Sequence, residues 1–261
     1  MRRIVGVALL AAIALAATAA TCVVTHESLT TIGEHDTFAG EMENDSGVDI
    51  LNHRFRVAFL NSNGAVVETV SVEGCLRSLQ DGGSDFFSAA SRLPASMTAI
   101  GLARMANAAE DPSFSIGEVE DGAIVINEVT AVRVGTTLTI EGTITNNDDD
   151  TLEDPVVCAT VWNDENRVIT TKKVGNIDDL AKGEASTFTI AITVPDSSKL
   201  VHQVDVWADG LEDDDPVEPS SLGDVVVTVV APTATATATV TGTPATSTPV
   251  NTATPTATAT P

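Results

Sequence analysis

The sequence lacks tyrosine altogether, and its Phe and Trp residues amount to only 3% of the 261 residues. A hydrophobic core therefore has to be built from Val, Ile, Leu and Ala, and the β-branched members of that set favour strands over helices. Positive charge is also scarce, since 13 Lys and Arg stand against 37 Asp and Glu, giving a formal net charge of −24. A surface this acidic argues against partners such as nucleic acid and anionic lipid.

Cysteine is sparse as well, with Cys22, Cys75 and Cys158 as its three occurrences. An odd number cannot form a complete disulfide framework, and the chain has neither a Cys-x-x-Cys motif nor a zinc-type spacing. In an exported chain, Cys22 with Cys75 is one conceivable bridge. Nucleophile-elbow, zinc-protease and phosphate-loop motifs are also lacking, so we expect no enzyme and no cofactor.

The first 20 residues have the layout of a removable secretory signal peptide. Arg2 and Arg3 precede an apolar run at residues 4–17, and small residues at 17–20 suit cleavage. The run is too short to be a comfortable membrane span. Cys22 raises the alternative of a lipoprotein, in which an acylated cysteine is the only membrane anchor, although Thr21 fits the residue before such a cysteine poorly. We expect an exported protein, extracellular or at the cell surface.

Two segments of the chain, 102 residues apart, resemble each other. Residues 40–44 (GEMEN) correspond to residues 142–146 (GTITN), and Asn61 corresponds to Asn163. Further pairs at this offset are Val66 with Val168, Thr69 with Thr171, Ser84 with Ser186 and Phe86 with Phe188, while one inserted residue brings Leu79 opposite Leu180. Because the apolar pattern between these pairs also agrees, the sequence predicts two copies of one domain, at residues 21–110 and 118–212.

Apolar residues alternate with polar ones at period 2, which predicts half-buried strands. In the second copy we expect strands at residues 124–134, 138–144, 156–163, 167–174, 188–194 and 204–208. In the first copy we expect them at 22–32, 37–44, 53–61, 65–72, 84–91 and 99–106. The last of these could equally be helical, and strand is favoured by analogy with the second copy. Short strands separated by turn signals predict an all-β chain of two tandem immunoglobulin-like antiparallel β-sandwiches, preceded by a signal helix.

This pattern resembles the FxLYD family. The resemblance is carried by the Gly and Asn of residues 40–44 and 142–146, by a strand and turn at 57–61 and 159–163, and by Leu-x-x-Gly before a Phe-led strand. Asn replaces the family's Asp, and Leu or Trp replaces its Tyr. The resemblance covers about residues 22–209. It implies small extracellular immunoglobulin-like domains and brings no established catalytic residues.

Acidic residues crowd two loops that could supply oxygen ligands to Ca²⁺. The first loop contains the candidates Asp148, Asp149, Asp150 and Asp154, and the second follows the last predicted strand at residues 209–215. Neither has the spacing of an EF-hand, so solvated acidic loops are the alternative. The four histidines form no metal-binding pair at helical spacing. Residues 44–46 (NDS) form a glycosylation sequon, which makes Asn44 a candidate modification site in an exported protein.

Cys158, Trp162 and Trp207 fall on registers that face away from the predicted core. They could form an exposed patch for a partner or a contact between the two domains. Residues 213–230 are predicted to be an acidic linker with an apolar run that could add an edge strand. Residues 231–261 are almost wholly Thr, Ala and Pro, a composition that predicts a disordered stalk.

Together these features predict a non-enzymatic exported protein whose tandem sandwiches bind an unknown protein or cell-envelope component, or act as a spacer. The recognition surface would be the sandwich loops or a sheet edge. The alternative is an extracytoplasmic solute- or metal-binding accessory protein that uses the acidic loops or the histidines.

Overall fold

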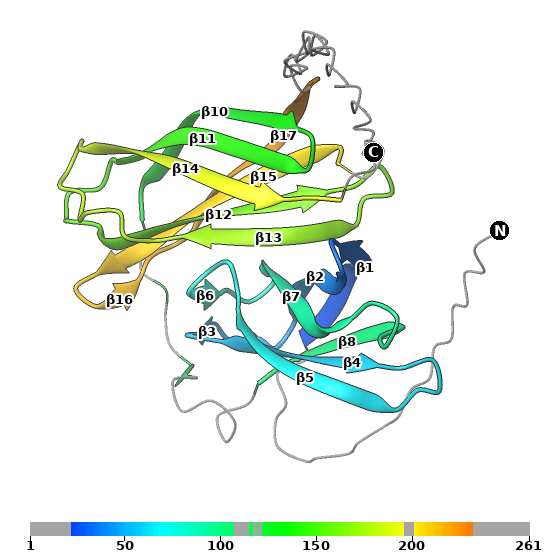
Figure 1. Ribbon diagram of the computed structural model, residues 1–261. Helices are drawn as coiled ribbons and strands as arrows, with labels where there is room; N and C mark the ends of the chain where they lie inside the picture. The colour runs from blue at the N-terminus through cyan, green and yellow to red at the C-terminus, as the bar shows by residue number, and fades with distance from the viewer. Residues whose placement is uncertain (1–21, 107–114, 117–118, 120–121, 196–200, 232–261) are drawn as a thin grey trace, which may run out of the picture. The chain divides into compact units, whose positions relative to one another are not determined.

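The computed structural model describes residues 22–106, 115–116, 119, 122–195 and 201–231. The predicted signal peptide and all of the predicted stalk except Ala231 lie outside these residues. The described residues belong to one compact unit, which ends at Ala231. Their regular elements are all strands, so the all-β prediction is confirmed and residues 100–105 are a strand rather than a helix (Figure 1). Among the described residues, no helix is long and apolar enough to cross a membrane.

The N-terminal half is built from three antiparallel sheets of three strands each. The first has the order β1-β2-β7, formed by β1 (Cys22–Ile32), β2 (His35–Asn44) and β7 (Ser84–Pro94). The second has the order β5-β4-β8, formed by β5 (Val66–Glu73), β4 (Arg54–Leu60) and β8 (Ile100–Met105). The third is short and has the order β6-β3-β9, formed by β6 (Ser78–Leu79), β3 (Ile50–Leu51) and β9 (Ser115–Ile116).

Alternate residues of the two larger sheets meet in an aromatic core. Phe55, Val57 and Phe59 of β4 are fully buried, and Phe87 of β7 lies 5.0 Å from Phe55 between ring centroids. The residues between them on β4 point to the opposite face and are partly exposed. The period-2 pattern of the sequence therefore places its apolar set inside, as a half-buried sheet requires.

The C-terminal half forms a single eight-stranded sheet that encloses its own core (Figure 1). The strand order is β13-β12-β15-β17-β10-β11-β14, with β16 paired to β15 alone. Its strands are β10 (Ile124–Val134), β11 (Thr137–Asn146), β12 (Glu153–Trp162), β13 (Val168–Val174), β14 (Ala185–Thr193), β15 (Gln203–Glu212), β16 (Asp215–Pro216) and β17 (Ser220–Val230). The core is aliphatic apart from Phe188, as the composition predicted, whereas the N-terminal core departs from that prediction because its phenylalanines fill it.

Strand β17 is not the edge strand that the sequence predicted. Its first part, up to Val226, pairs antiparallel with β15, and residues 227–230 pair in parallel with β10. The strand thus joins what would otherwise be two separate sheets. Leu222, Val225 and Val227 pack against the core. The apolar run therefore fills an interior position instead of lining a solvent-facing edge.

The two halves share their strand registers. Cys22 lies opposite Asn44 and Ile124 lies opposite Asn146, and both strand pairs have a bulge at the same place, before Ser28 and before Thr130. Each bulge contains one residue with a positive φ, which is His26 in β1 and Glu128 in β10.

The register corrects one pair in the sequence comparison. Gly142 lies opposite Phe188, and the corresponding Gly40 lies opposite Phe87, not Phe86. A Cβ added to either glycine would come within 3.2 Å of that ring, or closer. Both glycines thus make room for a core aromatic residue. Phe86, one position earlier, points away from this core.

Candidate functional site

The two halves contact each other through faces that turn away from their own cores. Ala39 of β2 and Phe86 of β7 pack against Cys158 and Trp162 of β12, together with Trp207 of β15. The Phe86 ring lies 5.7 Å from Trp162 and 5.1 Å from Trp207 between centroids. Of the two interpretations that the sequence left open for these tryptophans, the structure therefore supports the contact between halves.

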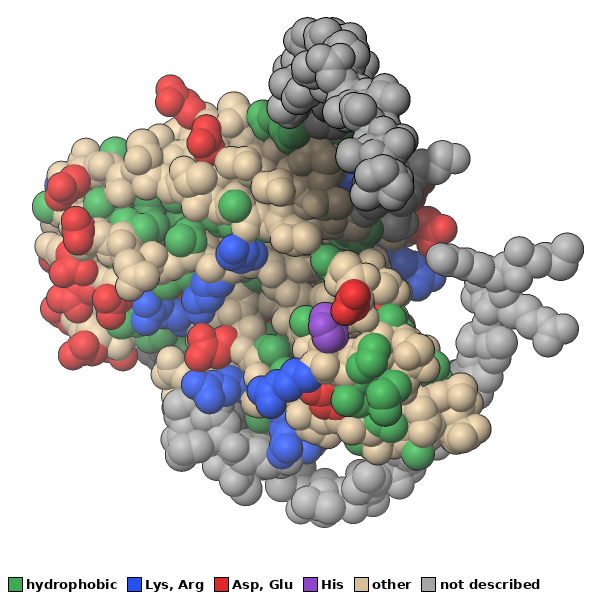
Figure 2. Space-filling view, in the orientation of Figure 1, with side chains coloured by type: hydrophobic (Ala, Val, Ile, Leu, Met, Phe, Trp, Pro, Cys, Tyr) green, Lys and Arg blue, Asp and Glu red, His purple; other side chains and the backbone are tan. Residues whose placement is uncertain are grey.

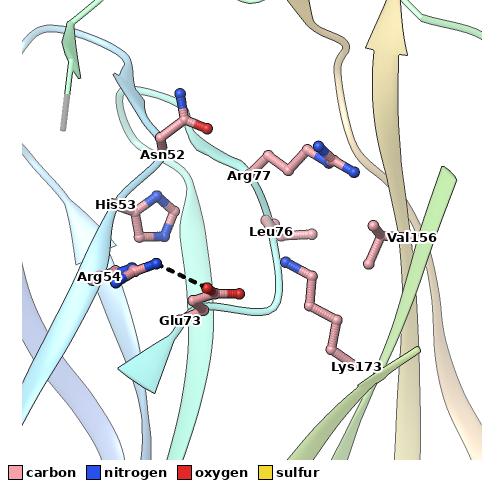
Figure 3. A pocket seen from close by; sticks show the side chains of 8 residues that line it. All are labelled: Asn52, His53, Arg54, Glu73, Leu76, Arg77, Val156 and Lys173. Atoms are coloured by element: carbon pink, nitrogen blue, oxygen red, sulfur yellow. Dashed lines mark hydrogen bonds and ion pairs between the residues drawn. The ribbon is translucent and has the colours of Figure 1, made fainter. Parts of the chain in front are cut away.

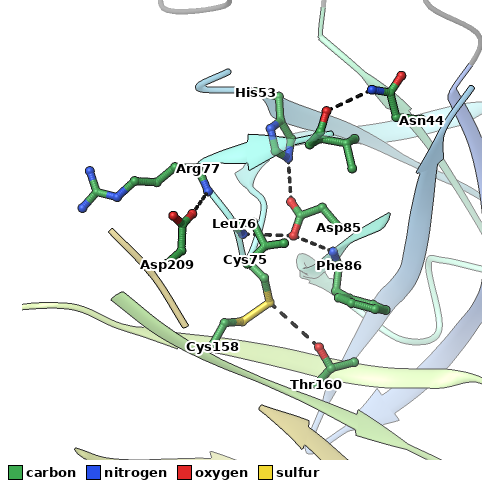
Figure 4. Close-up of polar contacts among 11 residues, drawn as sticks. Asn44, His53, Cys75, Leu76, Arg77, Asp85, Phe86, Cys158, Thr160 and Asp209 are labelled. Atoms are coloured by element: carbon green, nitrogen blue, oxygen red, sulfur yellow. Dashed lines mark hydrogen bonds and ion pairs between the residues drawn. A yellow bond between two sulfur atoms is a disulfide. The ribbon is translucent and has the colours of Figure 1, made fainter. Parts of the chain in front are cut away.

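A disulfide crosses this contact. It joins Cys75 to Cys158, 83 residues apart, and Cys22 is a free thiol (Figure 4). The bridge between Cys22 and Cys75 that the sequence allowed is wrong, because Cys22 begins β1 and faces the N-terminal core, whereas Cys75 lies at the contact between halves. One covalent link thus ties the N-terminal half to the C-terminal half.

Residues 74–77, which we call the strap, carry Cys75 and are held from both halves. On the N-terminal side, Asp85 Oδ1 accepts the N–H groups of Leu76 (3.0 Å) and Phe86 (2.7 Å). The other oxygen of Asp85 lies 2.6 Å from His53 Nε2, and both side chains are fully buried. Because the Asp85 carboxylate acts only as an acceptor in these bonds, His53 must carry a hydrogen on Nε2 and donate it to Asp85.

The strap has a glycine because the buried pair leaves no room for a side chain. A Cβ on Gly74 would lie 1.7 Å from Asp85 Oδ2 and 2.9 Å from His53 Nε2. The backbone therefore passes directly over the bond between the two side chains. His53 Nδ1 is buried and has no hydrogen-bond partner among the described residues.

On the C-terminal side, the strap is held by Asp209. Its carboxylate accepts the N–H of Arg77 and the N–H of Gly210, the latter at 2.7 Å. Burial raises the pKa of Asp209 to about 6, although both backbone donors and the charges of Arg77 and Lys173 act to lower it. The guanidinium of Arg77 also reaches the C-terminal half, where Nη2 donates to the carbonyl of Asp154 at 2.7 Å.

A cavity of about 390 Å³ lies beside the strap and is lined from both halves (Figure 3). Its lining residues are Asn52, His53, Arg54, Glu73, Leu76, Arg77, Val156 and Lys173. Basic groups outnumber the single carboxylate, and that carboxylate, on Glu73, pairs with Arg54 at 3.1 Å. Figure 2 shows Lys and Arg side chains gathered on this face of a molecule that is otherwise strongly acidic.

A second feature is the outer edge of β8. In the C-terminal half the corresponding strand, β15, is covered by β17, but no described strand lies on that side of β8. Ile100 and Leu102 of β8 are 47% and 56% exposed. The core beside this edge is also less well covered than the corresponding core of the C-terminal half. Leu29 and Ala103 are only partly buried, whereas the residues at the corresponding positions, Ala131 and Val206, are buried.

The predicted calcium ligands separate into two groups. Carboxylate oxygens of Asp148 and Asp150 come within 4.8 Å of each other and of Glu212, which belongs to the second acidic segment and is the last residue of β15 rather than a loop residue. Asp149 instead pairs with Lys182. Asp154 is not part of the cluster, and its carbonyl accepts from Arg77. Burial, a hydrogen bond with Asp150 and the neighbouring carboxylates raise the pKa of Glu212 to about 7.

The candidate glycosylation residue, Asn44, is buried. Its Nδ2, the atom to which a glycan would be attached, donates to the carbonyls of Val48, Leu79 and Gln80. Asn146 makes the equivalent bond to Leu180, as expected for an amide that closes a turn at a strand end. The folded protein therefore does not present Asn44 for modification. Lipidation of Cys22 stays a prediction.

Sequence reasoning missed the residues that line the cavity. Arg54, Arg77 and Lys173 carry no motif and are far apart in the chain. A usable signal was the uncharged run of residues 156–162, because a strand without charge on either face is typically covered on both sides. That signal would have indicated the contact between halves, and the cavity beside it follows only from the three-dimensional fold.

No family model matches the sequence, and no curated protein matches it either. Among solved structures, the chain resembles a calcium-binding mutant of Bacteroides uniformis beta-glucuronidase 2 with 12% identity and a TM-score of 0.26, over 74% of this chain and 26% of that one. A red sea bream transglutaminase gives 11% identity and a TM-score of 0.29, over 78% and 31%. A Listeria innocua beta-glucosidase gives 18% and 0.24, over 43% and 17%. The chain thus spans less than a third of each, and these similarities carry no functional argument.

Proposed function

We propose that the chain is a non-enzymatic, exported protein made of two tandem, FxLYD-like and immunoglobulin-like β-sandwiches that bind an extended segment of a partner protein or cell-envelope component. The observation that carries this proposal is the outer edge of β8, beside which the described part of the chain places no strand. Exposed sheet edges bind partner strands through main-chain hydrogen bonds, with specificity from alternate side chains.

The matched strand registers support a duplicated domain. The bulges in β1 and β10, the Asn44 and Asn146 amides and the glycines opposite Phe87 and Phe188 all recur at corresponding positions. In this interpretation β17 completes the second sandwich, and the first sandwich has no counterpart of it among the described residues. A partner strand would then take the position beside β8 and β1 that β17 takes beside β15 and β10.

A peptide with the sequence of residues 220–230 is a direct probe of this edge. We expect it to slow hydrogen exchange of the β8 amides, whereas the same peptide with alternate residues replaced by proline has no such effect. Lysine at both Ile100 and Leu102 should abolish the protection. Val66→Lys is the control, since Val66 is 60% exposed on β5 at the opposite edge of the same sheet. Unchanged exchange in β8 at saturating peptide would refute the edge as a binding site.

Export is supported by the disulfide, because such bonds persist in oxidising compartments. We expect fractionation of the expressing cell to recover the chain outside the cytoplasm, with residues 1–20 removed. Deletion of those residues should retain the protein in the cytoplasm. Recovery of the full-length chain with an intact leader in the cytoplasm would contradict this part of the proposal.

Calcium binding is a second candidate function, favoured by the proximity of Asp148, Asp150 and Glu212. Carboxylate oxygens are ligands that Ca²⁺ prefers, and a cation would relieve the repulsion among the three groups. Millimolar Ca²⁺ should then raise the melting temperature, and Glu212→Gln should reduce that rise. Asp154→Asn, outside the cluster, should leave it unchanged. A melting temperature that does not respond to Ca²⁺ would end this candidate.

A further inference from the structure

We propose that the cavity beside the strap binds a small organic carboxylate. The carboxylate group would lie between Arg77 and Lys173, and a short apolar body would lie against Leu76 and Val156 (Figure 3). This site is separate from the β8 edge, so its test does not depend on the function proposed above.

The charge at the cavity favours an anion. Arg54, Arg77 and Lys173 line it, and Glu73 is the only acidic lining residue. Glu73 is engaged by Arg54, and Asp209 nearby accepts two backbone N–H groups. The chain has only 13 Lys and Arg among 261 residues, and three of them meet here. In a molecule of net charge −24, this local excess of basic groups favours an anionic ligand.

The number of positive charges at the cavity favours a ligand with a single negative charge. With Arg54 neutralised by Glu73, two cations remain, and Asp209 compensates part of their charge. A dianion such as phosphate would add more negative charge than these groups balance, against the field of the whole protein. A planar carboxylate matches the fork of a guanidinium, so one negative charge is bound with directed hydrogen bonds.

Unused hydrogen-bonding capacity lies at the same place. Arg77 Nε is buried and has no partner among the described residues. A buried donor without a partner costs stability, and a ligand oxygen would remove that cost for Arg77 Nε.

The walls of the cavity are rigid. Cys75 immediately precedes Leu76 in the strap and is cross-linked to Cys158, and Asp209 holds the Arg77 backbone. Val156 and Lys173 come from β12 and β13, which pair with each other through residues 157–162 and 168–174. A site held in this way loses little conformational entropy on binding, which favours a small ligand. The cavity volume of about 390 Å³ falls in the range of small-molecule sites.

Isothermal titration with sodium isocaproate tests the proposal. We expect one saturable site per chain, with isocaproamide, the neutral isostere, binding at least about tenfold more weakly because it lacks the charge. Acetate, which lacks the apolar body, should also bind more weakly. Absence of saturable binding, equal affinity for the amide, or tighter binding of inorganic phosphate would each overturn the proposal.

Lys173→Met locates the site, since it removes the charge and keeps most of the side-chain stem. We expect isocaproate affinity to fall about tenfold or more. Lys172→Met is the matched control, because Lys172 is adjacent but donates to the carbonyl of Ala191 and does not line the cavity. Its affinity should equal that of the unmodified chain. Equal melting temperatures would show that both variants are folded, and unchanged affinity in Lys173→Met would refute the assignment.

Discussion

Replacement of Cys75 and Cys158 by alanine should strongly destabilise the protein. The disulfide closes a loop of 83 residues, and the chain-entropy model gives about 4.5 kcal/mol for a loop of that length. Most domains have a free energy of unfolding of about 5–15 kcal/mol, so this loss is a large fraction of the total. The effect is large because the bridge joins the two halves and not neighbouring strands.

Urea denaturation at neutral pH would measure the loss, and Cys22→Ala is the control. Cys22 is half-buried in β1 and free, so its replacement should cost less than about 1 kcal/mol.

Tryptic digestion without reduction should yield residues 57–77 linked to residues 134–167, with the Cys22 thiol open to alkylation. Equal urea midpoints for the double variant and Cys22→Ala, or a linkage that includes Cys22, would refute the reasoning.

Three further predictions concern the contact between halves. Phe86→Ala should cost about 3–5 kcal/mol and change the near-UV circular dichroism of the tryptophans, because the ring contacts both Trp162 and Trp207; an unchanged Trp signal would contradict this. Asp209→Asn should flatten the dependence of stability on pH between about 4 and 6. The raised pKa means that the folded chain loses up to about 3 kcal/mol as Asp209 ionises over that window; parallel stability curves from urea denaturation at each pH would show the reasoning to be wrong. Gly74→Ala should cost several kcal/mol, on the order of 3, by displacing Asp85 from His53, whereas Gly64→Ala, with open space around its Cβ, should cost about 1 kcal/mol for its positive φ; similar urea midpoints for the two would contradict the crowding argument.

The strands were predictable because their signal is local. Alternation in residues 188–194 lies within β14 and its flanking residues, and the same rule identified β4 and β11. The turn asparagines were also predictable, since Asn61 and Asn163 each accept two backbone N–H groups in their turns. In these cases the residue and its partner lie within a few positions of each other.

Other features depend on partners far away in the chain. Phe86 and Phe87 are indistinguishable in the sequence, and only the register opposite Gly40 decides which ring enters the N-terminal core. The position of β17 between β15 and β10 is similar, because an apolar run has the same pattern in an interior strand as in a half-buried edge strand. Three cysteines likewise allow three single bridges, and the fold selects one.

The distribution of aromatic residues explains why the contact between halves forms at all. Among the described residues, four phenylalanines fill the N-terminal core, and Phe188 is the one phenylalanine of the C-terminal core. Both tryptophans stand instead on the outer face of the C-terminal sheet, where β12 has no charged residue from position 155 to 162. In a chain of net charge −24, an uncharged aromatic face of this kind exposed to water would be costly, and the outer face of β2 and β7 covers it with Ala39 and Phe86. Phenylalanines thus stabilise the N-terminal half, aliphatic residues stabilise the C-terminal half, and Phe86 with the two tryptophans stabilises the two halves against each other.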